Sequence, residues 1–283
     1  MTDAQRIQQK HLRDLERLKR LRLLDDDFMT KCFEGEPEAI QLVLRILLDK
    51  PDLVVTDVRT QVLLKNLLNR SVFLDVLASD SAQRKYNVEI QRDDHGAGYP
   101  RARFHSSALD TNLLEKGWDF EDLPETYVVF ITEKDVIGRG RAVYRVERYF
   151  DTGEPFPDGS HIVYVNGAYR DDSPIGRLMH DLACPDPNQM HYDVLADRVR
   201  FFKENEKGVS AMCKVFEELR QEGMQEGIQE GMQKGIQRGE ERRSIQLVHD
   251  MLAAGKYALE EIAALSGLPL SEIQRIQAAR ETP

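Results

Sequence analysis

The feature that most limits the fold of this chain is a change of hydrophobic period after residue 48. Before that point the apolar residues recur at helical spacing, and a helix is predicted over residues 36–48. The pattern then becomes β-rich, with polar breaks between residues 54–64, 71–78 and 85–92. A helix over residues 100–116 follows, and then a continuous apolar run, 127–132, which is typical of a strand covered on both faces. This order of helix, three strands, helix and strand predicts a mixed α/β core.

Composition divides the chain into four predicted segments. They are a charged N-terminal helix (1–24), the α/β domain (25–216), a Gly-rich repeat (217–243) and a small module resembling a helix-turn-helix (244–283). The α/β domain also has predicted strands at 142–150 and 161–167 and closing helices at 173–184 and 192–204. The last module reads as three short helices broken at 255–257 and 267–269.

The repeat places a glycine at every fourth residue from Gly223 to Gly239. Each glycine costs roughly 1 kcal/mol in a helix relative to alanine, which argues against a freely standing helix. Two interpretations are open. The glycines and regular Met and Ile residues form a helical contact with a second copy of the chain, giving a homo-oligomer, or the segment is a flexible spacer. The Met and Ile regularity favours the helical contact.

The charge of the chain limits its class of partner. A formal net charge of −10 excludes a histone-like, generally basic nucleic-acid binder, but it is compatible with a nucleic-acid enzyme whose positive charge is local. Residues 1–24 carry seven Lys or Arg against three Asp or Glu. That helix is predicted either to pack on the body of the protein with a solvated charged face or to contact nucleic-acid phosphates.

Cysteine usage and hydropathy bear on the compartment. Cys32, Cys184 and Cys213 form no CxxC motif, so free thiols in a reducing, cytoplasmic setting are expected. No run of eighteen apolar residues occurs, so no membrane partner is expected. The first 24 residues lack the apolar region of a secretory signal.

Two acidic residues on neighbouring predicted strands carry the strongest chemical signal. Strand alternation places Asp75 on one face of its strand and Glu89 on one face of the next. A hairpin centred near Ala82 would pair Asp75 directly with Glu89 and place Leu77 opposite Asn87. The other face of the first strand is predicted to carry Val72, Leu74 and Val76.

Such a pair needs neutralisation. Opposed strand residues have Cβ atoms about 4.5–5.5 Å apart, where like charges destabilise the pair, and carboxylates among apolar neighbours are costly. A divalent cation such as Mg²⁺, which prefers carboxylate, carbonyl and water oxygens, would neutralise them and could polarise a phosphodiester. The alternative is that each acid points to solvent and pairs with a neighbouring cation, Arg84, Lys85 or Arg92.

Asp75 in VFLDVLA, followed by Glu89 and Gln91 in YNVEIQR, resembles the PD-(D/E)XK nuclease core, and in particular its recombination-promoting nuclease and transposase branch. Other segments resemble that branch in the same order: DDDFMTKCFEG, GYPRARFHSSALDTNLLEKGWDFEDLPETYVVFITEKD, SHIVYVNGAY and FKENEKGVSAMCKVFEELR. The resemblance covers roughly residues 25–240 and rests on order and spacing. It implies a restriction-endonuclease-like α/β core (helix, three-stranded β-meander, helix, strand) with a helical C-terminal tail.

The resemblance also implies a function, namely Mg²⁺-dependent cleavage of DNA in recombination or transposition, with Mn²⁺ as a substitute metal. Asp75 and Glu89 match the metal ligands, and the carbonyl of Ile90 matches a third. Asp27 is the candidate for the acid of the first helix, although a helix-capping role is an equal alternative.

One departure from the family pattern leaves a second function open. Gln91 stands where the superfamily has lysine, so a dipole replaces a positive charge. The alternative is therefore a catalytically weak or inactive nuclease-fold protein that acts as a DNA-binding or oligomerising module. Arg101 and Arg103 are predicted to contact DNA phosphates, or else to form ion pairs with Asp93, Asp94 or Asp110.

Three histidines were considered as catalytic or metal-binding residues, and none lies in a recognised motif of either kind. His105 lies beside two serines, but there is no nucleophile-elbow motif. His180 and His191 have ten residues between them, a spacing that fits no zinc motif. His180 and His191 are predicted to be structural.

Overall fold

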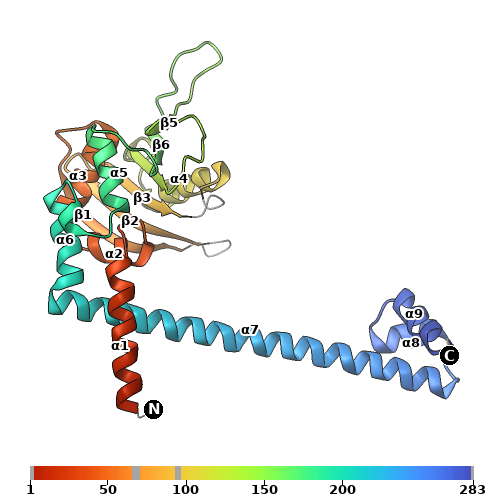
Figure 1. Cartoon of the computed structure of the whole chain (residues 1–283). Helices are drawn as coiled ribbons and strands as arrows, with labels where there is room; N and C mark the ends of the chain where they lie inside the picture. Colours follow the sequence, from red (N-terminus) through yellow and green to blue (C-terminus); the bar gives the residue numbers. More distant parts are fainter. Residues whose placement is uncertain (1–2, 66–70, 93–96, 282–283) are drawn as a thin grey trace. The chain divides into compact units, whose positions relative to one another are not determined.

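The computed structural model describes residues 3–65, 71–92 and 97–281, and the chain forms two compact units, residues 1–216 and 217–283. The first unit is built on a six-stranded sheet with the order β1-β2-β3-β4-β6-β5 (Figure 1). The first three strands form an antiparallel meander, β4 and β6 extend the sheet in parallel, and β5 pairs antiparallel with β6. The strands are β1 (Val55–Leu64), β2 (Val72–Asp80), β3 (Lys85–Gln91), β4 (Thr126–Thr132), β5 (Val143–Val146) and β6 (Ser160–Asn166). The predicted mixed α/β fold is confirmed.

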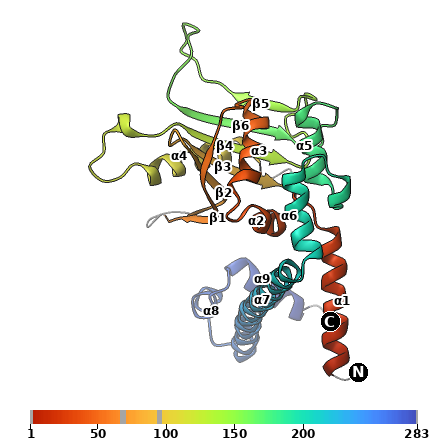
Figure 2. The same cartoon turned by 90° about the vertical axis from the view of Figure 1, so that its left-hand side faces the viewer.

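Helices cover both faces of the sheet (Figure 2). The helices that contribute to the larger apolar cluster include α1 (Asp3–Arg20), α2 (Asp26–Phe33), α3 (Pro37–Leu48), α5 (Pro174–Ala183), α6 (Asp193–Glu204) and the start of α7 (Glu206–Ala254). The opposite face packs against α4 (Tyr99–Leu113). All of β4 is buried: Val129 packs in the larger cluster and Val128 in the other. This explains the continuous apolar run, because a strand between two helical layers has no polar face.

The register of the β2–β3 hairpin agrees with the sequence prediction. Val76 lies opposite Val88, and Leu77 lies opposite Asn87. Continued by one residue, this ladder brings Asp75 opposite Glu89.

The prediction that Val72, Leu74 and Val76 share one face is wrong. Leu74 packs in the α4 cluster, whereas Val76 packs in the larger cluster on the other face. The alternation of side chains between the two faces of β2 changes at Asp75. Gln61 on β1 lies opposite Asp75, since the residues next to Gln61 pair with the residues next to Asp75. Gln61 has a left-handed backbone with φ 51°, which is uncommon for a residue with a Cβ and interrupts the pleat at this point.

The edge strand β5 is shorter than predicted. Residues 142–150 were expected to form one strand, but pairing with β6 ends at Val146. Residues 147–150 are exposed and make only an isolated bridge, Tyr149 with Pro155. An edge strand forms hydrogen bonds with a neighbour on one side only, so its end is held in the sheet less firmly than the end of a central strand.

The second unit is helical. The long helix α7 (Glu206–Ala254) begins in the first unit and carries the whole repeat, so residues 217–243 are helical, and their contact with a second copy stays a prediction. The boundary predicted between residues 243 and 244 falls inside this helix, since no glycine or proline interrupts residues 240–254. After Gly255, α8 (Leu259–Ser266) and α9 (Leu270–Glu281) pack with the end of α7 through Val248, Met251, Ile262 and Ile273.

Two further expectations concern bulk properties. In the part of the chain that the structure describes, no helix is both long enough and apolar enough to cross a membrane. The three cysteines are free, and Cys32 and Cys184 are buried.

Candidate functional site

Asp75 and Glu89 are held together by reciprocal contacts with each other's strand. The Asp75 N–H donates to Glu89 Oε1 at 3.3 Å. In return, the Ile90 N–H donates to Asp75 Oδ2 at 3.1 Å. The two carboxylates therefore lie side by side on the hairpin, and the structure brings together the acids that the sequence predicted as a pair.

The environment of the pair disfavours two negative charges. Glu89 is fully buried, and its Oε2 has no hydrogen-bond partner among the described residues. Burial, with the nearby charges of Glu89 and Asp26, raises the pKa of Asp75 to about 8, although the Ile90 N–H and Arg101 act in the opposite direction. The pair thus retains a proton near neutral pH unless a cation takes its place.

Helix α4 supplies two basic side chains to this site. Arg101 Nη2 lies 3.8 Å from Glu89 Oε2, and His105 Nδ1 lies 3.4 Å from Glu89 Oε1. Arg101 Nε also donates to His105 Nε2 at 3.3 Å. His105 Nδ1 also lies 3.4 Å from Asn87 Nδ2, so this ring nitrogen faces both Asn87 and Glu89.

The sequence analysis assigns His105 no role at this site, and the structure shows that it contacts Glu89. Arg101 and His105 are four residues apart and so share one face of a helix. This spacing is the sequence signal that places both side chains at one site.

Helix α2 begins with Asp26 and Asp27, and the charge of Asp26 bears on the carboxylate pair. The charge of Asp26 contributes to the raised pKa of Asp75. Partial burial, Asp27 and then Glu89 raise the pKa of Asp26 in turn. Asp26 and Asp27 are both exposed, and the helix N-cap is Asp25, so Asp27 is not the capping residue, and its place in the metal site stays a prediction.

The other predicted site residues divide into two groups. Gln91 Oε1 accepts from Arg101 Nη1 at 3.2 Å, so Gln91 and Arg101 lie together beside the carboxylates. Ile90 contributes its N–H to Asp75, and its carbonyl as a metal ligand stays a prediction. Arg103, two residues from Arg101, is exposed and has no side-chain contact with the site among the described residues.

The alternative cation partners of the two acids are engaged elsewhere. Arg84 pairs with Asp80, Lys85 donates to Ser79, and Arg92 pairs with Asp25. Of the alternative partners of Arg101 and Arg103, Asp93 and Asp94 lie outside the described residues. The third, Asp110, accepts from Thr126.

The donor set of the site fits a hard divalent cation. Asp75 and Glu89 supply carboxylate oxygens, one of which is buried without a donor, and Asp26 adds negative charge nearby. Buried charges are normally paired or bound to a metal, and Mg²⁺ or Mn²⁺ prefers oxygen ligands. Arg101 and His105 partly compensate Glu89, but they leave the pKa of Asp75 raised.

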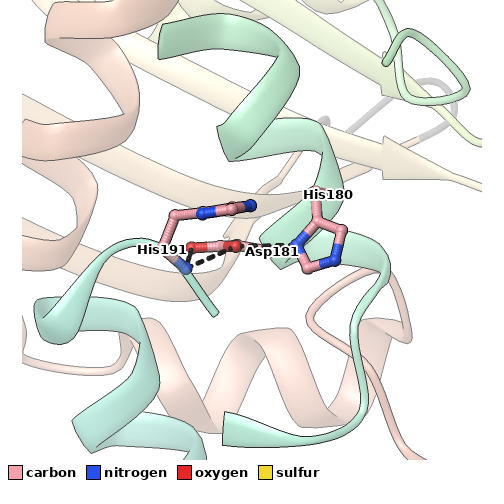
Figure 3. A group of neighbouring side chains, drawn as sticks. All are labelled: His180, Asp181 and His191. Atoms are coloured by element: carbon pink, nitrogen blue, oxygen red, sulfur yellow. Dashed lines mark hydrogen bonds and ion pairs between the residues drawn. The ribbon is translucent and has the colours of Figure 1, made fainter. Parts of the chain in front are cut away.

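A second cluster comprises His180, Asp181 and His191, whose ligand atoms lie within 4.8 Å of one another. Figure 3 shows the Asp181 carboxylate beside the His180 ring and the main-chain nitrogen of His191. Asp181 is fully buried and accepts from the N–H groups of His191 and Tyr192 at 2.8–2.9 Å, and it lies 3.0 Å from His180 Nδ1. Both carboxylate oxygens are thus used in holding the start of α6. The cluster is explained without a metal, in agreement with the structural roles predicted for the histidines.

Comparison with family models, with curated proteins and with solved structures found no match for the chain. The resemblance to PD-(D/E)XK nucleases therefore stays a prediction from the sequence motifs.

Proposed function

We propose that this protein is a Mg²⁺-dependent DNA endonuclease that hydrolyses phosphodiester bonds at the Asp75–Glu89 pair. The observation that carries the proposal is the buried Glu89 Oε2, which accepts no hydrogen bond and has the Arg101 guanidinium no closer than 3.8 Å, beside a second carboxyl group of raised pKa. A bound divalent cation supplies polarisation of a phosphodiester oxygen and a more acidic coordinated water. Asp75 and Glu89 would hold it, with the Ile90 carbonyl as the candidate third ligand.

The surrounding elements support this choice over a purely structural acid pair. An antiparallel meander, a crossing helix and a parallel strand are the order that the family resemblance implies, and the pair lies on the second and third strands of that meander. A structural carboxylate gains stability from donors that satisfy its oxygens. Glu89 instead keeps an oxygen without one at full burial.

The missing lysine has a candidate replacement on α4. The Arg101 guanidinium lies 3.2 Å from Gln91 Oε1 and 3.8 Å from Glu89 Oε2, so a positive charge stands beside the residue that occupies the lysine position. Arg101 would place this charge near a developing phosphoryl charge, and Gln91 would orient the guanidinium. Asp26, one residue before the predicted Asp27, adds a negative charge that bears on Asp75.

The test is cleavage of a supercoiled plasmid with Mg²⁺ or Mn²⁺ by four proteins: wild type, Asp75→Asn, Glu89→Gln and the control Asp57→Asn. Asp57 lies on the same meander and is exposed, so its variant makes the same chemical change outside the site. Loss of an outer-shell group costs about 10–100-fold, so loss of a ligand should reduce the rate by more than ~100-fold. Equal cleavage by wild type and Asp75→Asn would remove the site assignment.

A readout besides activity is needed because Gln91 also motivates the second function, a DNA-binding or oligomerising module without cleavage. Titration calorimetry with Mn²⁺ should give a binding isotherm for wild type and none for Glu89→Gln. Absence of Mg²⁺ and Mn²⁺ binding at millimolar concentration in wild type would favour the non-catalytic module instead.

A further inference from the structure

A groove of about 730 Å³ along α1 (Asp3–Arg20) concentrates positive charge on an acidic protein. Its lining includes five guanidinium groups, those of Arg13, Arg17, Arg20, Arg22 and Arg92. Only two carboxylates, Glu16 and Asp25, share the lining. A chain with a net charge of −10 has therefore gathered a local excess of arginine in one groove.

Three of these arginines form a row on one face of the helix. Arg13, Arg17 and Arg20 are spaced by four and three residues, which places them on successive turns over about 10 Å of helix axis. All three are exposed. Within the described ranges, Arg13 and Arg20 form no ion pair, and Arg17 stacks over the Phe216 ring at 4.5 Å, which leaves the edges of its guanidinium available to an anion.

The inner end of the groove is built differently. Arg92 pairs with Asp25 at 2.9 Å, and Arg22 pairs with Glu133 at 2.8 Å. These ion pairs fix the position of the groove wall. Arg92 directly follows Gln91, and Asp25 directly precedes Asp26, so this end of the groove is continuous in sequence with two residues of the carboxylate site.

We propose that this arginine groove binds the sugar-phosphate backbone of the DNA on which the Asp75–Glu89 site acts. The inference rests on the proposed function, because it takes the nuclease substrate as the ligand. A row of unpaired guanidiniums is suited to successive phosphates, each of which accepts two parallel N–H bonds. A packing helix would need no such row, and its arginines would be paired with carboxylates as Arg22 and Arg92 are.

The test measures DNA binding without cleavage. Fluorescence anisotropy of a labelled duplex in EDTA would compare wild type with the triple variant Arg13→Gln, Arg17→Gln, Arg20→Gln. The control triple variant is Arg238→Gln, Arg242→Gln, Arg243→Gln, which removes three exposed arginines from the second unit and changes the net charge equally. Glutamine is close to arginine in helix propensity, and circular dichroism checks that the helices are intact.

The groove variant should bind at least ~10-fold more weakly than wild type near 0.1 M salt. Its slope of log affinity against log salt should be reduced by about 2 to 3, because each phosphate contact contributes roughly 0.9. The control should stay within about 2-fold of wild type. Equal losses in both triple variants, no DNA binding by wild type, or displacement of the duplex by polyglutamate as readily as by unlabelled DNA would each overturn the proposal.

The two proposals fail separately. If wild type does not cleave with Mg²⁺ but the groove variant alone loses DNA binding in EDTA, DNA binding by the groove is supported and the nuclease activity is refuted. If wild type cleaves and the groove variant binds DNA normally, the nuclease activity is supported and DNA binding by the groove is refuted.

Discussion

Replacing Asp75 by asparagine should stabilise the metal-free protein at alkaline pH and not at acid pH. In the folded protein the pKa of Asp75 is raised to about 8, by burial first and then by Glu89 and Asp26. In the unfolded chain an aspartate has a pKa of about 3.9. The folded state therefore binds more protons than the unfolded state between these two values. Its free energy of unfolding falls as the pH rises through this window.

The magnitude follows from the difference between these values. About four pKa units correspond to an upper bound of roughly 5–6 kcal/mol at about 1.36 kcal/mol per unit. Asp75 is only half-buried, so solvent screening should leave about 2–3 kcal/mol. Asparagine has no charge to lose, and its oxygen can still accept from the Ile90 N–H. The variant should exceed wild type by this amount at pH 8 and equal it near pH 4–5.

Urea unfolding in EDTA at several pH values measures the effect. Trp118 is the single tryptophan and lies in the first unit, so its fluorescence reports the unit that holds the site. Asp57→Asn is the matched control and should change stability by less than about 0.5 kcal/mol at every pH. Mn²⁺ at about 100 times its Kd should stabilise wild type by about 2.7 kcal/mol and leave Asp75→Asn unchanged. If Asp75→Asn destabilised the protein equally at pH 5 and pH 8, the charge-repulsion argument would be refuted.

Three further predictions address other parts of the molecule. Arg101→Gln should lower plasmid cleavage by about 10²-fold and Arg101→Lys by less, since Lys retains the positive charge beside Gln91; equal rates for both variants would contradict this role. Asp181→Asn should cost about 2 kcal/mol in urea unfolding, because one amide oxygen cannot accept all the bonds made by the carboxylate; an unchanged midpoint would contradict it. The double variant Gly227→Ala, Gly231→Ala should raise helical stability by about 1 kcal/mol per site in thermal circular dichroism, since an added Cβ meets no atom within 4 Å in the isolated chain. If the repeat forms a homo-oligomer through its glycines, the same variant should reduce the mass found by sedimentation, and an unchanged oligomer mass would exclude the glycine contact.

Much of the fold was predictable because it depends on local periodicity. Period-two stretches became β1, β2 and β3, and the apolar run of residues 127–132 became the buried β4. The hairpin register was predictable too, since a short turn leaves few ways to pair two strands. Hence the proximity of Asp75 and Glu89 followed from the sequence, as the reciprocal backbone bonds show.

The local sequence pattern did not predict features of a strand that depend on the neighbouring strand. The end of β5 lost its predicted pairing because an edge strand has one neighbour, and the alternation of β2 changed at Asp75 because Gln61 on the adjacent strand left the extended conformation. Neither effect is visible within the strand concerned.

The positions of the central strands and the pairing of Asp75 with Glu89 could be predicted from the sequence, because these features depend on residues that are near in the chain. Tertiary contacts were needed to show that Arg101 rather than Arg103 faces Glu89 and that His105 contacts it. The tertiary structure also brought His180 and His191 together around a buried carboxylate. The physical reason is that such contacts join elements distant in sequence, and the rotation of each helix on the sheet is set by packing of the core, which no local period records.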